Sequence, residues 1–171
     1  MNITKVLESG DVERFHQCVG MTNQRNSEHQ WGVSLLLQHF FPDCRKEVLL
    51  AAMTHDSTEL VWGDIPATTK WSAPEIKIIL DELEAVTETE WGIDFDITTE
   101  EKQMVKSCDM LEGMQYCLKR VEMGERKASV PFYAWYNHIE KNNLIRNRFQ
   151  LYMIGEMYTD MGVLMVVTHG S

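Results

Sequence analysis

The feature that most constrains the fold is a histidine beside an aspartate, His55-Asp56, which follows the apolar residues 48–53 after one threonine. A polar pair at the end of a buried segment costs free energy unless an opposite charge lies beside it. A divalent cation would supply that charge, because neutral imidazole and carboxylate are both metal ligands. We therefore interpret this stretch as half of a metal site, which the fold must complete from elsewhere in the chain.

The length and charge of the chain limit the kind of protein it can be. Its 171 residues favour one domain over residues 1–171. A net charge of −10 argues against a nucleic-acid polymer as partner, but not against a small phosphorylated ligand. The four cysteines form no C-x-x-C pair and indicate reduced thiols in the cytoplasm. No signal peptide is visible, and the C-terminal apolar run is too short to cross a membrane.

Apolar residues recur at three- and four-residue spacing along most of the chain, and no alternating strand pattern is present, so we expect an all-α fold. Gly124 is expected to end the longest helix. Residues 91–97 are expected to form a loop, and residues 132–152 keep helical spacing as one segment. The expected helix N-caps are Ser27, Asp43, Ser72 and either Thr98 or Thr99.

Two other places offer ligands that a helical bundle can gather around His55 and Asp56. His29 stands near the start of a helix, where the alternative is a surface residue. Asp109 stands in an apolar stretch, where a carboxylate is rare unless it is paired or metal-bound. Its alternative is a salt bridge to an arginine on a neighbouring helix. Together these groups form a mixed nitrogen and oxygen site that suits Mn, Co, Fe, Zn or Ni. No histidine falls between His55 and Asp109, which favours one metal over a bridged pair.

Three further charged residues have spacings that connect them with this site. Glu59, four residues after His55, is placed for proton transfer if the helix persists that far. Lys106 precedes Asp109 by three residues and shares its helix face, while Lys70 follows a Gly-Asp-Ile-Pro turn. Both lysines are candidates for contacting a phosphate chain, and the alternative for each is a solvated surface group.

These residues, in this order, resemble the HD-domain metal-dependent phosphohydrolases. The resemblance is greatest to the bacterial 5'-deoxynucleotidases and the related phage dATP triphosphohydrolases. It spans roughly residues 14–120 and includes an HD pair, a glutamate three residues later and a Gly-Asp-Ile-Pro turn. The Glu-Asp pair of the stringent-response hydrolases and the Gly-Tyr-Pro signature of the cyclic-dinucleotide enzymes are not seen.

The resemblance implies a single-domain helical bundle of the HD-domain type. It also implies one divalent transition metal per chain, Co, Mn or Zn, and a homo-oligomer that is at least a dimer. Phe15 stands where the family usually has a tryptophan. The implied metal ligands are His29, His55, Asp56 and Asp109, the implied catalytic residues are Glu59 and Asp64, and the implied substrate contacts are Arg14, Phe15, Lys70 and Lys106.

The expected function is hydrolysis of deoxynucleotide phosphates. The compact chain, with both lysines present, favours a phage dATP triphosphohydrolase that yields deoxyadenosine and triphosphate or removes phosphates stepwise. The alternative is a 5'-deoxynucleotidase that acts on monophosphates. A third hypothesis is a helical module that binds a nucleotide without cleaving it, but the presence of Glu59 argues against it. The expected partner is therefore a small deoxynucleotide, in the host cytoplasm if the chain is phage-encoded.

Overall fold

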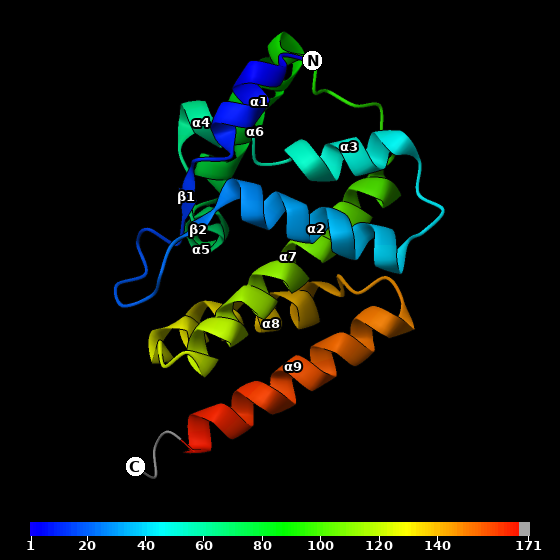
Figure 1. Ribbon diagram of the computed structural model, residues 1–171. Coiled ribbons are helices and arrows are strands. Elements are labelled where there is room, and N and C mark those ends of the chain that lie inside the picture. Colours follow the sequence, from blue (N-terminus) through cyan, green and yellow to red (C-terminus); the bar gives the residue numbers. More distant parts are fainter. Residues whose placement is uncertain (168–171) are drawn as a thin grey trace.

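A computed structural model describes residues 1–167, and these residues form an all-α fold, as the sequence predicts (Figure 1). A two-residue antiparallel pair, β1 with β2, joins Arg14 to Gln24 and was not predicted, because it is too short to give an alternating pattern. The elements are α1 (Ile3–Ser9), β1 (Glu13–Arg14), β2 (Gln24–Arg25), α2 (Asn26–Phe40), α3 (Lys46–Thr54), α4 (Glu59–Trp62), α5 (Ala67–Ser72), α6 (Pro74–Trp91), α7 (Thr99–Glu122), a 3-10 turn (Arg126–Ala128), α8 (Ser129–Asn142) and α9 (Arg148–Val167).

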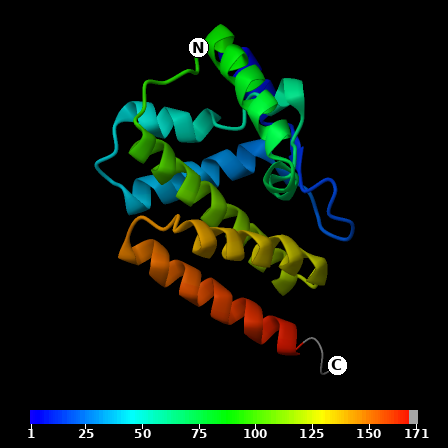
Figure 2. The same ribbon diagram turned by 180° about the vertical axis from the view of Figure 1, so that it is seen from behind.

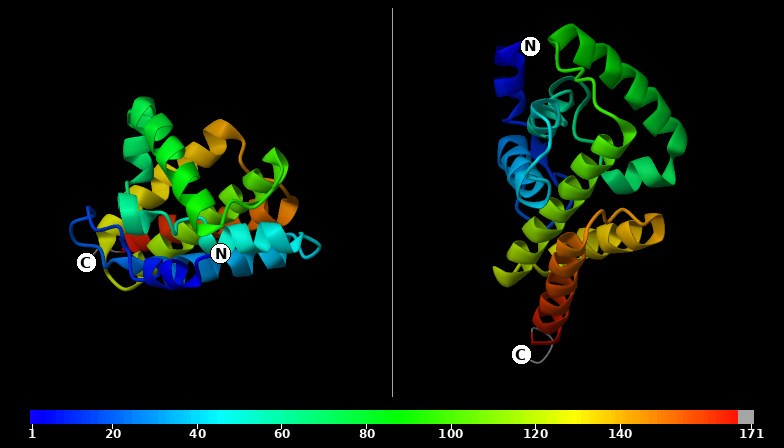
Figure 3. Two further views of the ribbon diagram at one scale, coloured as in Figure 1. Left: turned by 90° about the horizontal axis from the view of Figure 1, so that it is seen from above. Right: turned by 90° about the vertical axis from the view of Figure 1, so that its right-hand side faces the viewer.

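Helix α7 is the central element. It packs against α2 and α3 on one side and against α8 and α9 on the other. Figure 1 and the view from behind in Figure 2 both show α8 and α9 as a layer below α7, with α2 and α3 above it. Figure 3 shows α6 at the end of the molecule away from α9.

Each side of α7 has its own apolar core. Cys108 on α7 packs with Val33 of α2 and Ala52 of α3, whereas Leu111 on α7 packs with Phe132 of α8. All of these side chains are buried. Asp109 therefore lies on a helix that is fixed from both sides, which holds its carboxylate in place.

The long helix begins and ends close to where the sequence predicts. The Thr98 hydroxyl accepts a hydrogen bond from the Glu101 backbone N–H, and the Glu101 carboxylate accepts one from the Thr98 N–H, a complete capping box. The helix ends at Glu122, and Gly124 adopts a φ of 95° directly after it. Residues 92–98 form the expected loop, but Trp91 is the last residue of α6.

Three expected N-caps were wrong. Helix α2 begins one residue before Ser27, whose backbone N–H instead donates to the Gly10 carbonyl. Ser72 ends α5, and its hydroxyl donates back to the Thr69 carbonyl rather than capping α6. Asp43 lies in the turn before α3, which begins at residue 46. For Ser27, a contact with the preceding segment replaces the local cap that its sequence pattern predicts.

The expected single helical segment over residues 132–152 is also wrong, because two helices share it. Asn143 takes the left-handed conformation, with a φ of 49°, and ends α8. Asn147 then starts α9, because its side-chain oxygen accepts hydrogen bonds from the N–H groups of Phe149 and Gln150. The break allows α9 to fold back along α7.

Two expectations from composition concern the chain as a whole. Cys18, Cys44, Cys108 and Cys117 are all free thiols. Within residues 1–167, no helix has both the length and the apolar character that a membrane span requires.

Candidate metal centre and adjoining pocket

The four residues expected to bind metal come from α2, from the turn after α3 and from α7, and they lie close together. The His29 Nε2 atom lies 3.3 Å from His55 Nε2, 3.5 Å from Asp56 Oδ2 and 3.1 Å from Asp109 Oδ1. His55 Nε2 lies 3.3 Å from Asp56 Oδ2 and 4.0 Å from Asp109 Oδ1. Donors about 3.3 Å apart are what a tetrahedral metal with bonds of about 2.0–2.1 Å requires. The spacing of His29, His55 and Asp109 therefore fits a single ion, with Asp56 beside the two imidazoles.

The second nitrogen of each imidazole explains why these donors need a cation. His29 Nδ1 contacts the Glu112 carboxylate, and His55 Nδ1 lies 2.9 Å from the Ala52 carbonyl oxygen. An acceptor at Nδ1 holds the proton of a neutral imidazole there and leaves the lone pair on Nε2. Two lone pairs and two carboxylate oxygens would then face one another. The ligand atoms of His29, His55 and Asp109 lie within 4.8 Å of one another, so these three residues fit a divalent metal, and the Asp56 carboxylate lies beside both imidazoles.

The pKa values of His29 and Asp56 shift in the direction that favours positive charge in the cluster, whereas burial lowers the pKa of His55. Burial, the largest influence, opposes protonation of His29, and so does Arg14, yet the carboxylates of Asp109 and Glu112 raise its pKa. Burial also opposes ionisation of Asp56, but His55 and Arg14 lower its pKa to about 2. The carboxylate is therefore charged at neutral pH.

Two cations of the protein contact the same carboxylates. Arg14, on β1, is buried and forms an ion pair with Asp56, and its Nη2 atom lies 3.9 Å from Asp109 Oδ1. Lys106 Nζ lies 2.6 Å from Asp109 Oδ2. An arginine does approach Asp109, as the alternative interpretation required, but the Asp109 oxygen nearest to it lies closer to His29. Arg14 therefore lies beside the cluster, and Asp109 still contacts His29.

The two expected acid–base residues lie beside the cluster, although one reason for expecting this was wrong. Helix α3 ends at Thr54, so His55 and Glu59 do not share a helix face, and a turn carries the chain into α4. Glu59 is 7% exposed and accepts a hydrogen bond of 2.9 Å from Asn26. Burial and, next, the charge of Asp56 raise the pKa of Glu59 to about 9. Burial also raises the pKa of Asp64.

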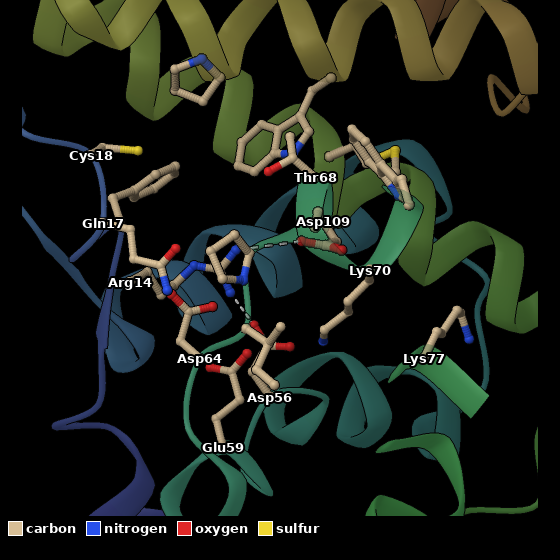
Figure 4. Close-up of a pocket in the computed structure, with 18 of the residues that line it drawn as sticks. Arg14, Gln17, Cys18, Asp56, Glu59, Asp64, Thr68, Lys70, Lys77 and Asp109 are labelled. Carbon is tan, nitrogen blue, oxygen red and sulfur yellow. Dashed lines mark hydrogen bonds and ion pairs between the residues drawn. The ribbon is translucent and has the colours of Figure 1, made fainter. Parts of the chain in front are cut away.

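A pocket opens beside Asp56 and Asp109 (Figure 4). The four residues expected to contact the substrate, Arg14, Phe15, Lys70 and Lys106, all line it. Figure 4 shows Lys70 extending toward Asp56, with Lys77 farther from the carboxylates. The acidic lining is Asp56, Glu59, Asp64 and Asp109, the basic lining is Arg14, Lys70, Lys77 and Lys106, and the aromatic lining is Phe15, Trp71 and Trp135.

Phe15 forms part of the aromatic wall in an unusual backbone conformation. Its φ of 62° is rare for a residue with a side chain. The ring stacks on Tyr116 at a centroid distance of 5.5 Å and lies 5.6 Å from the ring of Trp135. These contacts hold a strained residue at the edge of the pocket, where strain often accompanies function.

The sequence interpretation missed several residues at this site. Glu112 lies one turn after Asp109 on α7, a spacing that could have identified it. Trp135 reaches the pocket only because α8 folds back on α7. Trp71 and Lys77 follow the Gly-Asp-Ile-Pro turn, and no pattern distinguished them from surface residues.

A family model and a solved structure both match this all-α chain. The family model of YfbR-like 5'-deoxynucleotidases matches residues 11–92, just under half of the chain, a segment that contains His29, His55 and Asp56 but ends before Asp109. One similar solved structure is the cyanophage S-2L HD phosphohydrolase DatZ, bound to dA and one catalytic Zn²⁺ ion. It has a TM-score of 0.70 and 18% identity, over 95% of this chain and 97% of that chain. No curated protein sequence matches the chain significantly. The resemblance to the HD phosphohydrolases is thus confirmed.

Proposed function

We propose that this chain is a metal-dependent hydrolase of deoxynucleotide phosphates. The observation that carries the proposal is the convergence of His29, His55, Asp56 and Asp109 beside a pocket with cationic and aromatic walls. The match to 5'-deoxynucleotidases and the fold shared with a phosphohydrolase bound to dA and Zn²⁺ support the same chemistry. The pocket is concave, as small-ligand sites generally are, and both acidic and basic side chains line it.

Each side chain has a role that follows from its place. When bound at the four donors, one divalent Co, Mn or Zn ion would polarise a phosphate oxygen and lower the pKa of a water. Arg14 offsets the negative charge that develops on the phosphate, and its ion pair with Asp56 holds it in position. Glu59 and Asp64 handle the proton, and Asn26 orients Glu59 by donating to its carboxylate.

The rest of the pocket supports a deoxynucleoside triphosphate as substrate, and we propose dATP. Lys70 and Lys106 add positive charge beside the carboxylates, as a triphosphate chain requires. Phe15 and Trp135 offer apolar faces against which a base or a deoxyribose can pack. The products would be deoxyadenosine and triphosphate, or the phosphates would leave stepwise. The dA bound in the structural neighbour supports adenine as the base, whereas the match to 5'-deoxynucleotidases keeps a monophosphate as the alternative substrate.

Chromatography of the products tests the proposal. The protein is incubated with dATP, dGTP or dAMP in the presence of Co²⁺, Mn²⁺ or Zn²⁺. We expect deoxyadenosine from dATP, with triphosphate or with successive phosphates. Cleavage of dAMP but not dATP would favour the 5'-deoxynucleotidase. Nucleotide binding without any product would favour the binding module.

Replacing Lys70 with methionine should distinguish long from short phosphate chains. One lost charge-assisted contact corresponds to about a tenfold change in binding. We therefore expect the KM for dATP to rise about tenfold and the KM for dAMP to change much less. Lys5→Met, which breaks an exposed ion pair with Glu8, is the matched control. An equal rise for both nucleotides would contradict a role on the distal phosphates.

We also propose a homo-oligomer and a single domain over residues 1–171, in the cytoplasm. Several apolar side chains on the outer face of α9 support an oligomer, among them Leu151, Tyr152 and Val163, which are exposed in the single chain. Light scattering of the purified protein measures the assembly directly, and a monomer at all concentrations would contradict it.

A further inference from the structure

The His29 imidazole is held at both edges by the same helix. Asp109 of α7 contacts its Nε2 atom from the metal side, and Glu112, one turn farther along α7, contacts its Nδ1 atom from behind. The imidazole is fully buried, and the Glu112 side chain is 13% exposed. Helix α7 therefore fixes the rotation of this ring as well as supplying a donor to the cluster.

The carboxylate of Glu112 is itself held in place. Its Oε1 atom accepts a hydrogen bond of 2.7 Å from the side-chain amide of Gln24, which is 2% exposed and belongs to β2. The other carboxylate oxygen, Oε2, contacts His29 Nδ1. The chain of contacts from Gln24 through Glu112 to His29 joins β2, α7 and α2, three elements that pack around the cluster.

A glycine on α2 makes room for this contact. Gly32 lies one turn after His29, and a Cβ atom there would lie 2.7 Å from Glu112 Cγ and 3.1 Å from its Oε1. At the shorter distance, the Glu112 side chain would have to move to make room for the Cβ atom. Glycine inside a helix is less stable than alanine, so the close approach of Glu112 gives a reason for this one.

We propose that Glu112 is a positioning residue for the metal centre, acting through His29, and that Gly32 is the space that permits it. The inference rests on the proposed function, because it assumes a metal at His29. A carboxylate at the second nitrogen of a ligating imidazole fixes its tautomer and orientation and increases its basicity as a ligand. Glu112 lines a separate groove and does not line the proposed substrate pocket, so its role would be exerted through His29.

Metal affinity measured without substrate tests this role. Binding of Co²⁺ and Zn²⁺ is followed by competition with a chelator, and the visible absorption of bound Co²⁺ reports the ligand geometry. Glu112→Ala should weaken binding by about 10- to 100-fold. Glu112→Gln should weaken it less, because its side-chain carbonyl can still accept from His29. Gly32→Ala should weaken binding and alter the Co²⁺ spectrum, although both partners are chemically intact.

Two controls separate positioning from stability. Glu101→Gln makes the same change on the same helix, but it removes an ion pair with Arg45 far from the cluster and leaves an acceptor for the Thr98 N–H. Gly155→Ala adds the same methyl group on α9, where nothing lies within 4 Å. Neither should change the affinity for Co²⁺. With saturating metal, Glu112→Gln should keep the wild-type KM for the nucleotide, since only the metal site is perturbed.

The outcomes distinguish this inference from the proposed function. A wild-type protein that binds neither ion would overturn both. Wild-type binding with unchanged affinity in Glu112→Gln and Gly32→Ala would overturn the role of Glu112 alone. If Glu112→Ala fails to fold, the other two variants decide the question. An equal loss of affinity in Glu101→Gln would mean that helix stability, rather than the contact with His29, controls the metal site.

Discussion

Replacing Asp56 should abolish metal binding and hydrolysis together. Its Oδ2 atom lies 3.3 Å from His55 Nε2 and 3.5 Å from His29 Nε2, and it also pairs with Arg14. One substitution therefore removes a donor from the metal and the group that holds the arginine in place. We expect metal affinity to fall by more than about 100-fold, since even outer contacts to a metal ligand are worth about 10- to 100-fold. Hydrolysis should fall by at least about 1,000-fold, more than the loss of one preorganised charge causes.

The choice of substitution matters because Arg14 is buried. Asp56→Ala leaves a buried guanidinium without its main partner, a change that costs about 3–5 kcal/mol of folding free energy in other proteins. Asp56→Asn keeps the shape and an acceptor for Arg14, so it separates lost chemistry from lost folding. Asp11→Asn, which removes a carboxylate from an exposed pair with Arg25, is the matched control. Hydrolysis that persists in Asp56→Asn without bound metal would show that the site assignment is wrong.

The four convergent donors could be predicted from the sequence because their chemistry is unusual for their surroundings. An imidazole beside a carboxylate after an apolar run, and an aspartate on an apolar helix face, each require an unseen partner. Convergence follows once every segment is helical, since a bundle can bring such groups to one point. The same argument did not identify Glu112, because a glutamate on a helix is ordinarily a solvent-exposed surface residue and requires no special partner.

Helix boundaries were predictable only where the cap is local. Thr98 and Glu101 satisfy each other within one turn, so the sequence alone identifies them. Ser27 has the same local pattern, but its N–H bonds to Gly10, which only the fold brings near. The break after α8 did leave a signal, because Asn143 is a residue type that tolerates the left-handed conformation.

Replacing Gly113 with alanine should damage both the fold and the pocket. A Cβ atom at this position of α7 would lie 1.7 Å from Cζ3 and 2.1 Å from Cη2 of the Trp135 ring. The ring is buried in the core beside α7, so it would have to move. Overpacking of this kind costs about 1–3 kcal/mol. Since Trp135 also lines the pocket and packs near Phe15, the KM for the nucleotide should rise as well.

The same substitution at Gly155 provides the control, and there we expect the free energy of unfolding to rise instead of fall. Nothing lies within 4 Å of a Cβ atom there, so alanine adds helix propensity without a clash and should stabilise the protein by about 0.5–1 kcal/mol. Urea unfolding of the two variants, with the KM for dATP measured in parallel, compares them directly. The difference in sign comes entirely from Trp135. If Gly113→Ala is as stable as Gly155→Ala, the tryptophan does not lie on the bare backbone of α7, and the aromatic wall of the pocket must be built differently.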